Sequence, residues 1–249
     1  MSTSSFRACL SLAFTLCAAV AITDCSGDPS GGEGSNLRFT VVQSAGCAGP
    51  ISTGCAIDRP LLAGVDERVR VRRGTGASSL PTNLTFTSSN LNIITLGSPE
   101  APVASDSDPS YFVPVHAAGV GTAYFEARAS KGAIYDRVQV RVANAATIDF
   151  TNNAGTALTG MAAVNLRVAE RMDIVGTGRD AQGNPLFSNN VVVWTVPDTT
   201  TVRLSWGTMP KGARIADDRV YLTGVAPGTA TVTATIGTVT RTLMATVTQ

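Results

Sequence analysis

Three arginines at alternate positions form the clearest chemical pattern in the chain. Arg68, Arg70 and Arg72 are separated by Val69 and Val71. Alternate side chains of a β-strand point to the same face, so we expect the three guanidinium groups to form one row. Guanidinium groups bind phosphates and carboxylates through two parallel hydrogen bonds, and such a row would suit a polyanionic glycan. A solvated outer face, or charge that protects an edge strand, is the alternative interpretation.

A second candidate binding surface lies in the segment 205–218. Trp206 and Met209 are followed there by Lys211 and Arg214. An exposed tryptophan flanked by cations could stack on a sugar ring or dock a protein partner. The same tryptophan could instead fold back as a lid over the end of its domain.

Residues that could carry catalysis or hold a metal are few. The chain has one histidine, His116, and it lacks the G-x-S-x-G turn that presents a serine nucleophile. Glu100, Asp106 and Asp108 could offer oxygens to calcium, but their spacing is not that of a calcium loop, and a role in turns is simpler. We therefore predict that the protein is not an enzyme and has neither a cofactor nor a metal site.

Cysteine spacing predicts one disulfide. Cys47 and Cys55 enclose a segment rich in Gly, Pro, Ser and Thr that has little core to hold it, and outside the cytosol we expect them to pair. Closing such a short loop would add about 2–3 kcal/mol of stability in the chain-entropy treatment. Cys25 is then left without a disulfide partner.

The first residues are typical of an export signal. A polar start containing Arg7 precedes a run of small and apolar residues at 8–21. That run is too short to cross a bilayer and suits the apolar core of a signal peptide. No later segment is apolar over the length that a transmembrane helix needs.

Two cleavage sites are compatible with this signal. Residues 22–25 resemble a bacterial lipoprotein processing box, with Asp24 where that box has a small residue. On this interpretation residues 1–24 are removed and Cys25 becomes the lipid-bearing first residue. Cleavage after Ala21 is the alternative, because the residues before it follow the small-x-small rule.

The residues that follow the signal, and the overall charge, limit where the protein acts and what it binds. The Gly- and Ser-rich segment 25–36 is predicted to be a flexible tether. With 19 basic and 18 acidic residues the net charge is +1, which gives no long-range field to capture nucleic acid or a membrane surface. We therefore expect an exported envelope protein that contacts the membrane only through a lipid anchor, or else a periplasmic or secreted protein.

The remainder of the chain contains an internal sequence repeat. The segment 119–123 is echoed at 226–230, and Phe86-Thr87 is echoed by Trp194-Thr195. The order of the matching segments is kept and each lies about 105 residues further along, which predicts two domains, at 37–144 and 145–249.

Each unit is predicted to be a two-sheet β-sandwich. Ala230, Val232 and Ala234 alternate with threonines, and this period of two gives one apolar and one polar face. About seven such short strands in about 100 residues, separated by turn residues, are typical of a sandwich.

These segments carry a family resemblance. Residues 224–234 resemble the closing motif of group 2 bacterial immunoglobulin-like domains, and Trp194-Thr195 resembles the middle-strand motif of that family. Residues 180–185 are similar to the hairpin turn of invasin-type domains. The resemblance implies an all-β chain of two tandem immunoglobulin-like sandwiches, and display and binding rather than catalysis. The chain departs from the family in its long connections at 97–110 and 205–218, which should emerge at the same end of each sandwich.

Two functions follow as hypotheses. The first is a non-enzymatic binding or adhesion module of the cell envelope or surface, whose partner is a polysaccharide or an envelope protein. The second is a structural spacer or envelope-assembly lipoprotein that has no dedicated ligand. Binding in the first would use the long loops or the arginine row.

Overall fold

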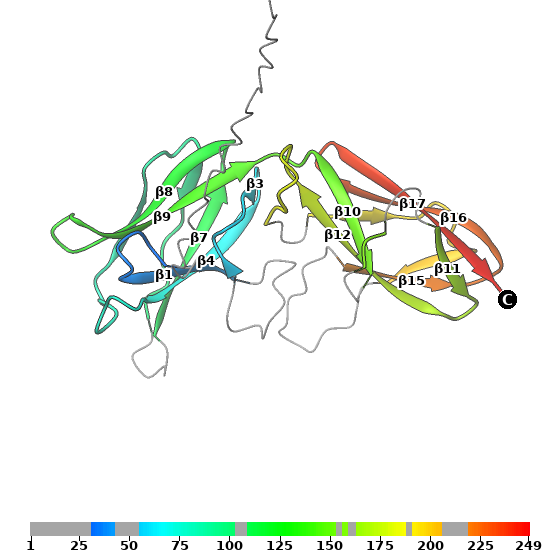
Figure 1. The fold of residues 1–249 in the computed structure, drawn as a ribbon, viewed down its shortest axis with the longest axis horizontal. Coiled ribbons are helices and arrows are strands. Elements are labelled where there is room, and N and C mark those ends of the chain that lie inside the picture. Colours follow the sequence, from blue (N-terminus) through cyan, green and yellow to red (C-terminus); the bar gives the residue numbers. More distant parts are fainter. Residues whose placement is uncertain are drawn as a thin grey trace, which may run out of the picture.

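The computed structural model describes residues 31–42, 55–102, 109–152, 156–158, 163–187, 191–205 and 219–249. Strands, turns and bends account for all of the regular structure in these ranges. No helix long and apolar enough to cross a membrane occurs within them. The prediction of an all-β chain is confirmed, and the strands form two β-sandwiches that lie end to end (Figure 1).

The first sandwich contains nine strands in two sheets. They are β1 (Leu37–Val41), β2 (Cys55–Ala56), β3 (Leu61–Leu62), β4 (Asp66–Arg73), β5 (Thr85–Ser88), β6 (Ile94–Leu96), β7 (Ser110–Ala117), β8 (Gly121–Arg128) and β9 (Ile134–Ala143). One sheet has the order β2-β1-β4-β7-β6, and the sheet packed against it has the order β3-β9-β8-β5.

The second sandwich contains the remaining eight strands. They are β10 (Thr147–Asn152), β11 (Ala163–Arg167), β12 (Arg171–Arg179), β13 (Val193–Thr195), β14 (Val202–Ser205), β15 (Arg219–Gly224), β16 (Gly228–Ile236) and β17 (Val239–Thr248). Their sheets have the orders β10-β12-β15-β14 and β11-β17-β16-β13. Apart from the added β2, both orders are those of the first sandwich.

The correspondence between the sandwiches extends to register. Gly121 begins β8 opposite Val142, and Gly228 begins β16 opposite Val247. Both glycines have positive φ, 146° and 154°, a conformation that a side chain would oppose. The connection from β6 to β7 and the connection from β14 to β15 also join equivalent strands.

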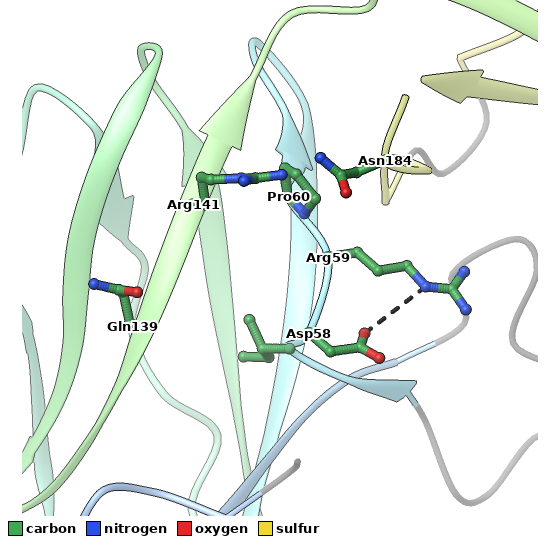
Figure 2. Close-up of a pocket in the computed structure, with 7 residues that line it drawn as sticks. Asp58, Arg59, Pro60, Gln139, Arg141 and Asn184 are labelled. Atoms are coloured by element: carbon green, nitrogen blue, oxygen red, sulfur yellow. Dashed lines mark ion pairs between the residues drawn. The ribbon is translucent and has the colours of Figure 1, made fainter. Parts of the chain in front are cut away.

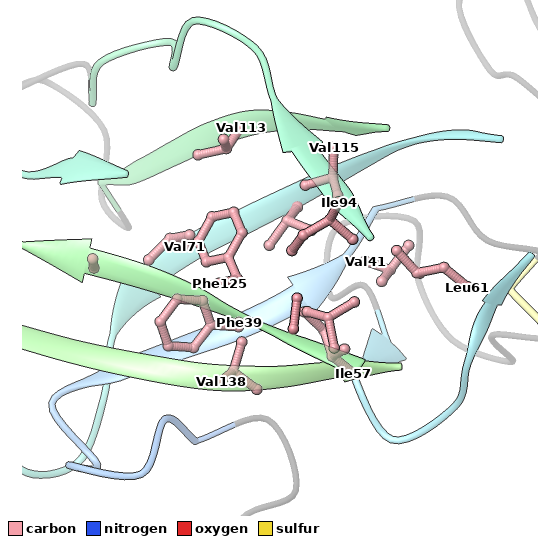
Figure 3. Packing of buried hydrophobic residues seen from close by; sticks show 14 of the residues in the cluster. Phe39, Val41, Ile57, Leu61, Val71, Ile94, Val113, Val115, Phe125 and Val138 are labelled. Carbon is pink, nitrogen blue, oxygen red and sulfur yellow. The ribbon is translucent and has the colours of Figure 1, made fainter. Parts of the chain in front are cut away.

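Each core lies between the two sheets of its sandwich. Phe39 and Phe125 meet edge to face, with ring centroids 5.5 Å apart, and Val71 and Val138 pack beside them (Figure 3). Trp194 has 4% of its surface exposed and packs against Phe150 at 5.4 Å in the second core. This agrees with the period-two pattern of the sequence, which puts alternate residues inside.

Residues 31–36 are bound to the first sandwich. Asp136, a buried residue of β9, accepts hydrogen bonds from the backbone N–H groups of Gly34 and Leu37, each at 2.8 Å. Arg137 reaches Glu33 at 2.6 Å. The prediction that the flexible tether extends to residue 36 is therefore wrong for residues 31–36, because a buried carboxylate 99 residues away from Leu37 holds them.

At the boundary each sandwich buries a hydrophobic side chain that belongs to the other half of the chain. Phe187 follows β12 in the second half of the chain, yet it is fully buried in the core of the first sandwich. Leu62 of β3 belongs to the first half and is buried in the core of the second. Each core therefore includes a residue of the other sandwich. We call this the interdomain joint.

Backbone hydrogen bonds fix the interdomain joint. The N–H of Leu62 donates to the carbonyl of Phe187 at 2.9 Å, and the N–H of Phe187 donates to the carbonyl of Pro60 at 2.8 Å. On its other side β3 pairs in parallel with β9. Because strand pairing and core packing hold the same few residues, the sandwiches cannot turn freely about the connection at 144–146.

The joint predicts that a mutation in one half destabilises the other. Phe187→Ala removes a core side chain of the first sandwich, and we expect the free energy of unfolding of that sandwich to fall by about 3–5 kcal/mol. Amide hydrogen exchange in β1 and β8 measures the change. The control is Val193→Ala, an exposed position of the second sandwich, which should stay within about 0.5 kcal/mol. Unchanged protection of β1 and β8 in Phe187→Ala would contradict the exchange of side chains.

Candidate functional site

The predicted arginine row lies on the outer face of a central strand. Glu67, Val69 and Val71 of β4 are buried, while Arg68, Arg70 and Arg72 are on the opposite side. Because β4 pairs with β1 on one side and with β7 on the other, the idea that these charges protect an edge strand is wrong. Arg38 of β1 lies opposite Arg72 and extends the row.

The arginine row makes contacts within its own sheet. Arg68 forms an ion pair with Glu100, and its guanidinium lies 4.3 Å from the centre of the Phe112 ring. The Nε of Arg70 donates to the Oγ of Ser110 at 2.8 Å. Part of the hydrogen-bonding capacity of the row is thus used inside the protein, although the Arg68 side chain remains 45% exposed.

The other acidic and imidazole candidates do not form a metal site in the described residues. Glu100 contacts Arg68, while Asp106 and Asp108 lie outside the described ranges. His116 pairs with Asp66 across β4 and β7, with 2.7 Å between Nδ1 and Oδ1. No cluster of three potential metal ligands occurs in the part of the chain that the structure describes.

Several predicted residues lie outside the described ranges. They are Cys25, Cys47, Trp206, Met209, Lys211 and Arg214. Cys55 is described: it begins β2 and its sulfur belongs to a disulfide. The pairing of Cys55 with Cys47 stays a prediction.

A cleft between the two sandwiches is a site that sequence reasoning missed. It has a volume of about 240 Å³ and lies beside the interdomain joint (Figure 2). It is lined by Ile57, Asp58, Arg59, Pro60, Gln139, Arg141 and Asn184. The segment before β3, the outer face of β9 and the turn after β12 supply these residues. Only the turn had a recognisable signal, the invasin-like hairpin motif at 180–185, which indicated a turn and not a site.

Asp180 organises the wall of the cleft that the second sandwich supplies. Its side chain accepts hydrogen bonds from the backbone N–H groups of Gln182 at 2.9 Å and Asn184 at 2.8 Å, and from the Asn184 amide. Arg141 of the first sandwich donates to it at 2.8 Å. Only 3% of the surface of Asp180 is exposed. One buried carboxylate thus holds two residues that line the cleft, one from each sandwich.

These hydrogen bonds shift the acidity of Asp180. Burial alone would raise the pKa of its carboxyl, but the hydrogen bonds from Asn184 and Gln182, together with the charge of Arg141, outweigh burial and lower the pKa. The lowered pKa keeps the Asp180 carboxylate ionised at neutral pH, where it can pair with Arg141.

The opposite wall holds a looser pair of charges. The Nε of Arg59 is 3.8 Å from an Asp58 carboxylate oxygen, too far for a hydrogen bond. The guanidinium of Arg59 lies 5.7 Å from the ring centre of Phe187, so this wall also contacts a residue of the interdomain joint. The described residues that line the cleft carry amide, carboxylate and guanidinium groups, which are suited to binding by hydrogen bonds.

Comparisons with known proteins give similarity in structure alone. No protein-family model matches the chain, and no curated protein matches it in sequence. Domains 4 and 5 of the S-layer protein SbsC are 20% identical, with a TM-score of 0.31 over 72% of this chain and 82% of that one. The Escherichia coli adhesin FdeC is 15% identical, with a TM-score of 0.32 over 87% of this chain and 65% of that one. Invasin, a bacterial integrin-binding protein, is 13% identical, with a TM-score of 0.30 over 88% and 41%. Similarity this low carries no conclusion about what this chain binds.

The lowered pKa of Asp180 predicts a pH-dependent contribution to stability. A carboxyl whose pKa is lower in the folded state stabilises the protein above its unfolded pKa of about 3.9, and this contribution is lost as the pH falls through the folded value. Asp180→Asn should therefore be less stable than wild type at pH 7, and the difference should shrink below about pH 4.

Denaturant unfolding at a series of pH values checks this prediction. Glu100→Gln serves as the control, because it removes an exposed ion pair and should change stability little at any pH. A stability difference for Asp180→Asn that stayed constant from pH 7 to pH 2 would show that the charge of Asp180 is not what stabilises the turn.

Proposed function

We propose that this chain is a non-enzymatic binding module of the bacterial cell envelope, built from two group 2 immunoglobulin-like domains. The observation that carries the proposal is the interdomain joint. Phe187 and Leu62 make the two sandwiches one stiff body, and a stiff body holds a binding surface at a fixed distance and orientation from its anchor. An exported protein with such a body and no catalytic constellation in its described residues is suited to display.

The proposed anchor is a lipid on Cys25. Gly34 and Leu37 are held by Asp136, so only a short part of the predicted tether remains between the anchor and the folded body. The segment 26–30, even fully extended, spans about 20 Å. A lipidated protein would therefore stand close to the membrane, with its first sandwich nearest to the lipid.

The proposed binding surfaces are the arginine row and the segment that contains Trp206. The row presents Arg38, Arg68, Arg70 and Arg72 on a single sheet face, which suits the acidic groups of a polyanionic glycan. An envelope protein with an acidic face is the other partner that this chemistry fits.

A second function, a structural spacer without a ligand, is favoured by one observation. Arg68 and Arg70 contact Glu100, Phe112 and Ser110, so these two arginines also have a structural role in their sheet. A spacer would need only the stiffness that the interdomain joint provides, and the charges of the arginine row would keep the protein soluble.

Co-sedimentation with isolated cell envelopes separates the two functions. If the row binds acidic glycans, the triple variant Arg68→Gln, Arg70→Gln, Arg72→Gln should bind at least tenfold more weakly, and wild-type binding should weaken as salt screens the charges. The control triple Arg167→Gln, Arg171→Gln, Arg203→Gln removes the same charge from exposed positions of the second sandwich and should bind like wild type.

The triple Trp206→Ala, Lys211→Ala, Arg214→Ala tests the loop surface in the same assay. Binding that neither the row triple nor the loop triple weakens would refute both proposed surfaces, and failure of the wild type itself to co-sediment would favour the spacer.

The intact mass of mature protein extracted from the native membrane fraction tests the anchor. We expect a chain that begins at Cys25 and carries the added mass of a diacylglycerol group. The cytoplasmic precursor, purified without export, is the control and should have the unprocessed mass. A soluble mature chain that begins at Ile22 without added mass would refute lipid anchoring.

A further inference from the structure

We propose that the cleft beside the interdomain joint binds one neutral sugar ring. The cleft is formed by both sandwiches, and among the described residues its lining includes none of the arginine row. The inference goes beyond the proposed function because it assigns a ligand class to a separate site. Four features of the cleft carry it: fixed polar groups, open hydrogen-bonding capacity, balanced charge and size.

Two side chains of the cleft are fixed before any ligand arrives. The Nδ2 of Asn184 donates to both carboxylate oxygens of Asp180, at 3.1 and 2.9 Å, and this sets which way the amide faces. Its oxygen is directed toward Arg59 on the other wall (Figure 2). Arg141 is held by Asp180 through one nitrogen, which leaves other N–H groups available. Groups that are already oriented lose little entropy when they bind a ligand.

The wall formed by the first sandwich has unused hydrogen-bonding capacity. Asp58 and Arg59 are neighbours at 3.8 Å without a hydrogen bond between them, and about half of the Asp58 side chain is exposed. Gln139 is exposed on the outer face of β9, two residues before Arg141. The cleft therefore offers a carboxylate and amide oxygens as acceptors, and guanidinium and amide N–H groups as donors.

The charges of the cleft cancel in pairs. Arg141 is balanced by Asp180, and Arg59 is balanced by Asp58. A charged ligand would lose its hydration shell, and the cleft has no net opposite charge whose attraction could offset that cost. Hydroxyl groups both donate and accept, so a neutral ligand with several adjacent hydroxyls matches donors and acceptors that lie side by side. Ile57 and Pro60 also line the cleft, but both are buried, so its accessible groups are mainly polar.

The size of the cleft restricts the ligand further. Its volume of about 240 Å³ is below the range of about 300–1,000 Å³ found for pockets that take drug-sized molecules. One sugar ring fits such a space, while the remainder of an oligosaccharide would lie outside it.

Titration of the mature exported protein with defined trisaccharides tests the inference. The probes are maltotriose and chitotriose, which are neutral, and trigalacturonate, which is acidic. Backbone amide NMR signals measure binding, and we expect a neutral trisaccharide to shift the signals of residues 57–60, 139–141 and 182–184. The acidic trisaccharide should bind at least tenfold more weakly than the better neutral one.

Variants locate the site. Arg59→Gln and Gln139→Ala each remove a group of the cleft that takes no part in the Asp180 network, and each should weaken binding of the neutral trisaccharide at least tenfold. Thr246→Ala is the matched control, because Thr246 lies on β17, the strand of the second sandwich that corresponds to β9, and it should bind like wild type. Gln139→Ala should keep the thermal midpoint of wild type, so that its loss of binding is not loss of folding. Arg59→Gln also removes the contact with the Phe187 ring, and its binding is measured well below its own thermal midpoint.

Each other outcome overturns the inference. Absence of any shift at 20 mM of either neutral trisaccharide excludes a sugar site, as does binding that both cleft variants retain. Preference for trigalacturonate excludes the neutral class. These results are independent of the envelope assay: envelope binding that persists without sugar binding refutes only the cleft, and sugar binding without envelope binding refutes only the proposed function.

Discussion

The exchange of Phe187 and Leu62 is the constraint on which the arrangement of the molecule depends. Phe187 of the second half is buried in the first core and Leu62 of the first half is buried in the second, so each core includes a side chain from the other sandwich. Hydrophobic packing at the joint is reinforced by the backbone bonds between β3 and Phe187, which leave no separate hinge. Burial of a Phe side chain contributes about 1.5–3 kcal/mol, a large fraction of the stability of a small domain.

The cleft exists because the joint does. Its three lining segments belong to different sandwiches, and they come together only where Phe187 holds β3 beside the turn that contains Asp180. Asp180 then fixes the polar groups of the cleft, because the same carboxylate binds Arg141 across the joint and orients the Asn184 amide. The arginine row, by contrast, belongs to one sheet of the first sandwich and does not depend on the relative position of the domains.

The sequence predicted the sandwiches well because local patterns encode them. Alternation along β16 and the glycine at the start of β8 and of β16 reflect constraints within a strand or a turn. The joint could not be predicted, because Phe187 resembles any core residue of its own half and nothing in the sequence shows that it crosses to the other. The cleft was missed for the same reason: Asp58, Gln139 and Asn184 are distant in sequence. The tether was predicted too long, since composition reveals Gly and Ser but not the buried Asp136 that binds them.

Residual dipolar couplings measured on the exported protein test the central claim, that the two sandwiches are one rigid body. Couplings from β1–β9 and from β10–β17 each define an alignment tensor for their own sandwich. If the joint is rigid, the two tensors should have the same magnitude. They should also have the same orientation when both sandwiches are placed as in the structure, with Leu62 and Phe187 each buried in the other sandwich. Tensors of different magnitude would show that the domains move independently, and the account of the joint and of the cleft would then be wrong.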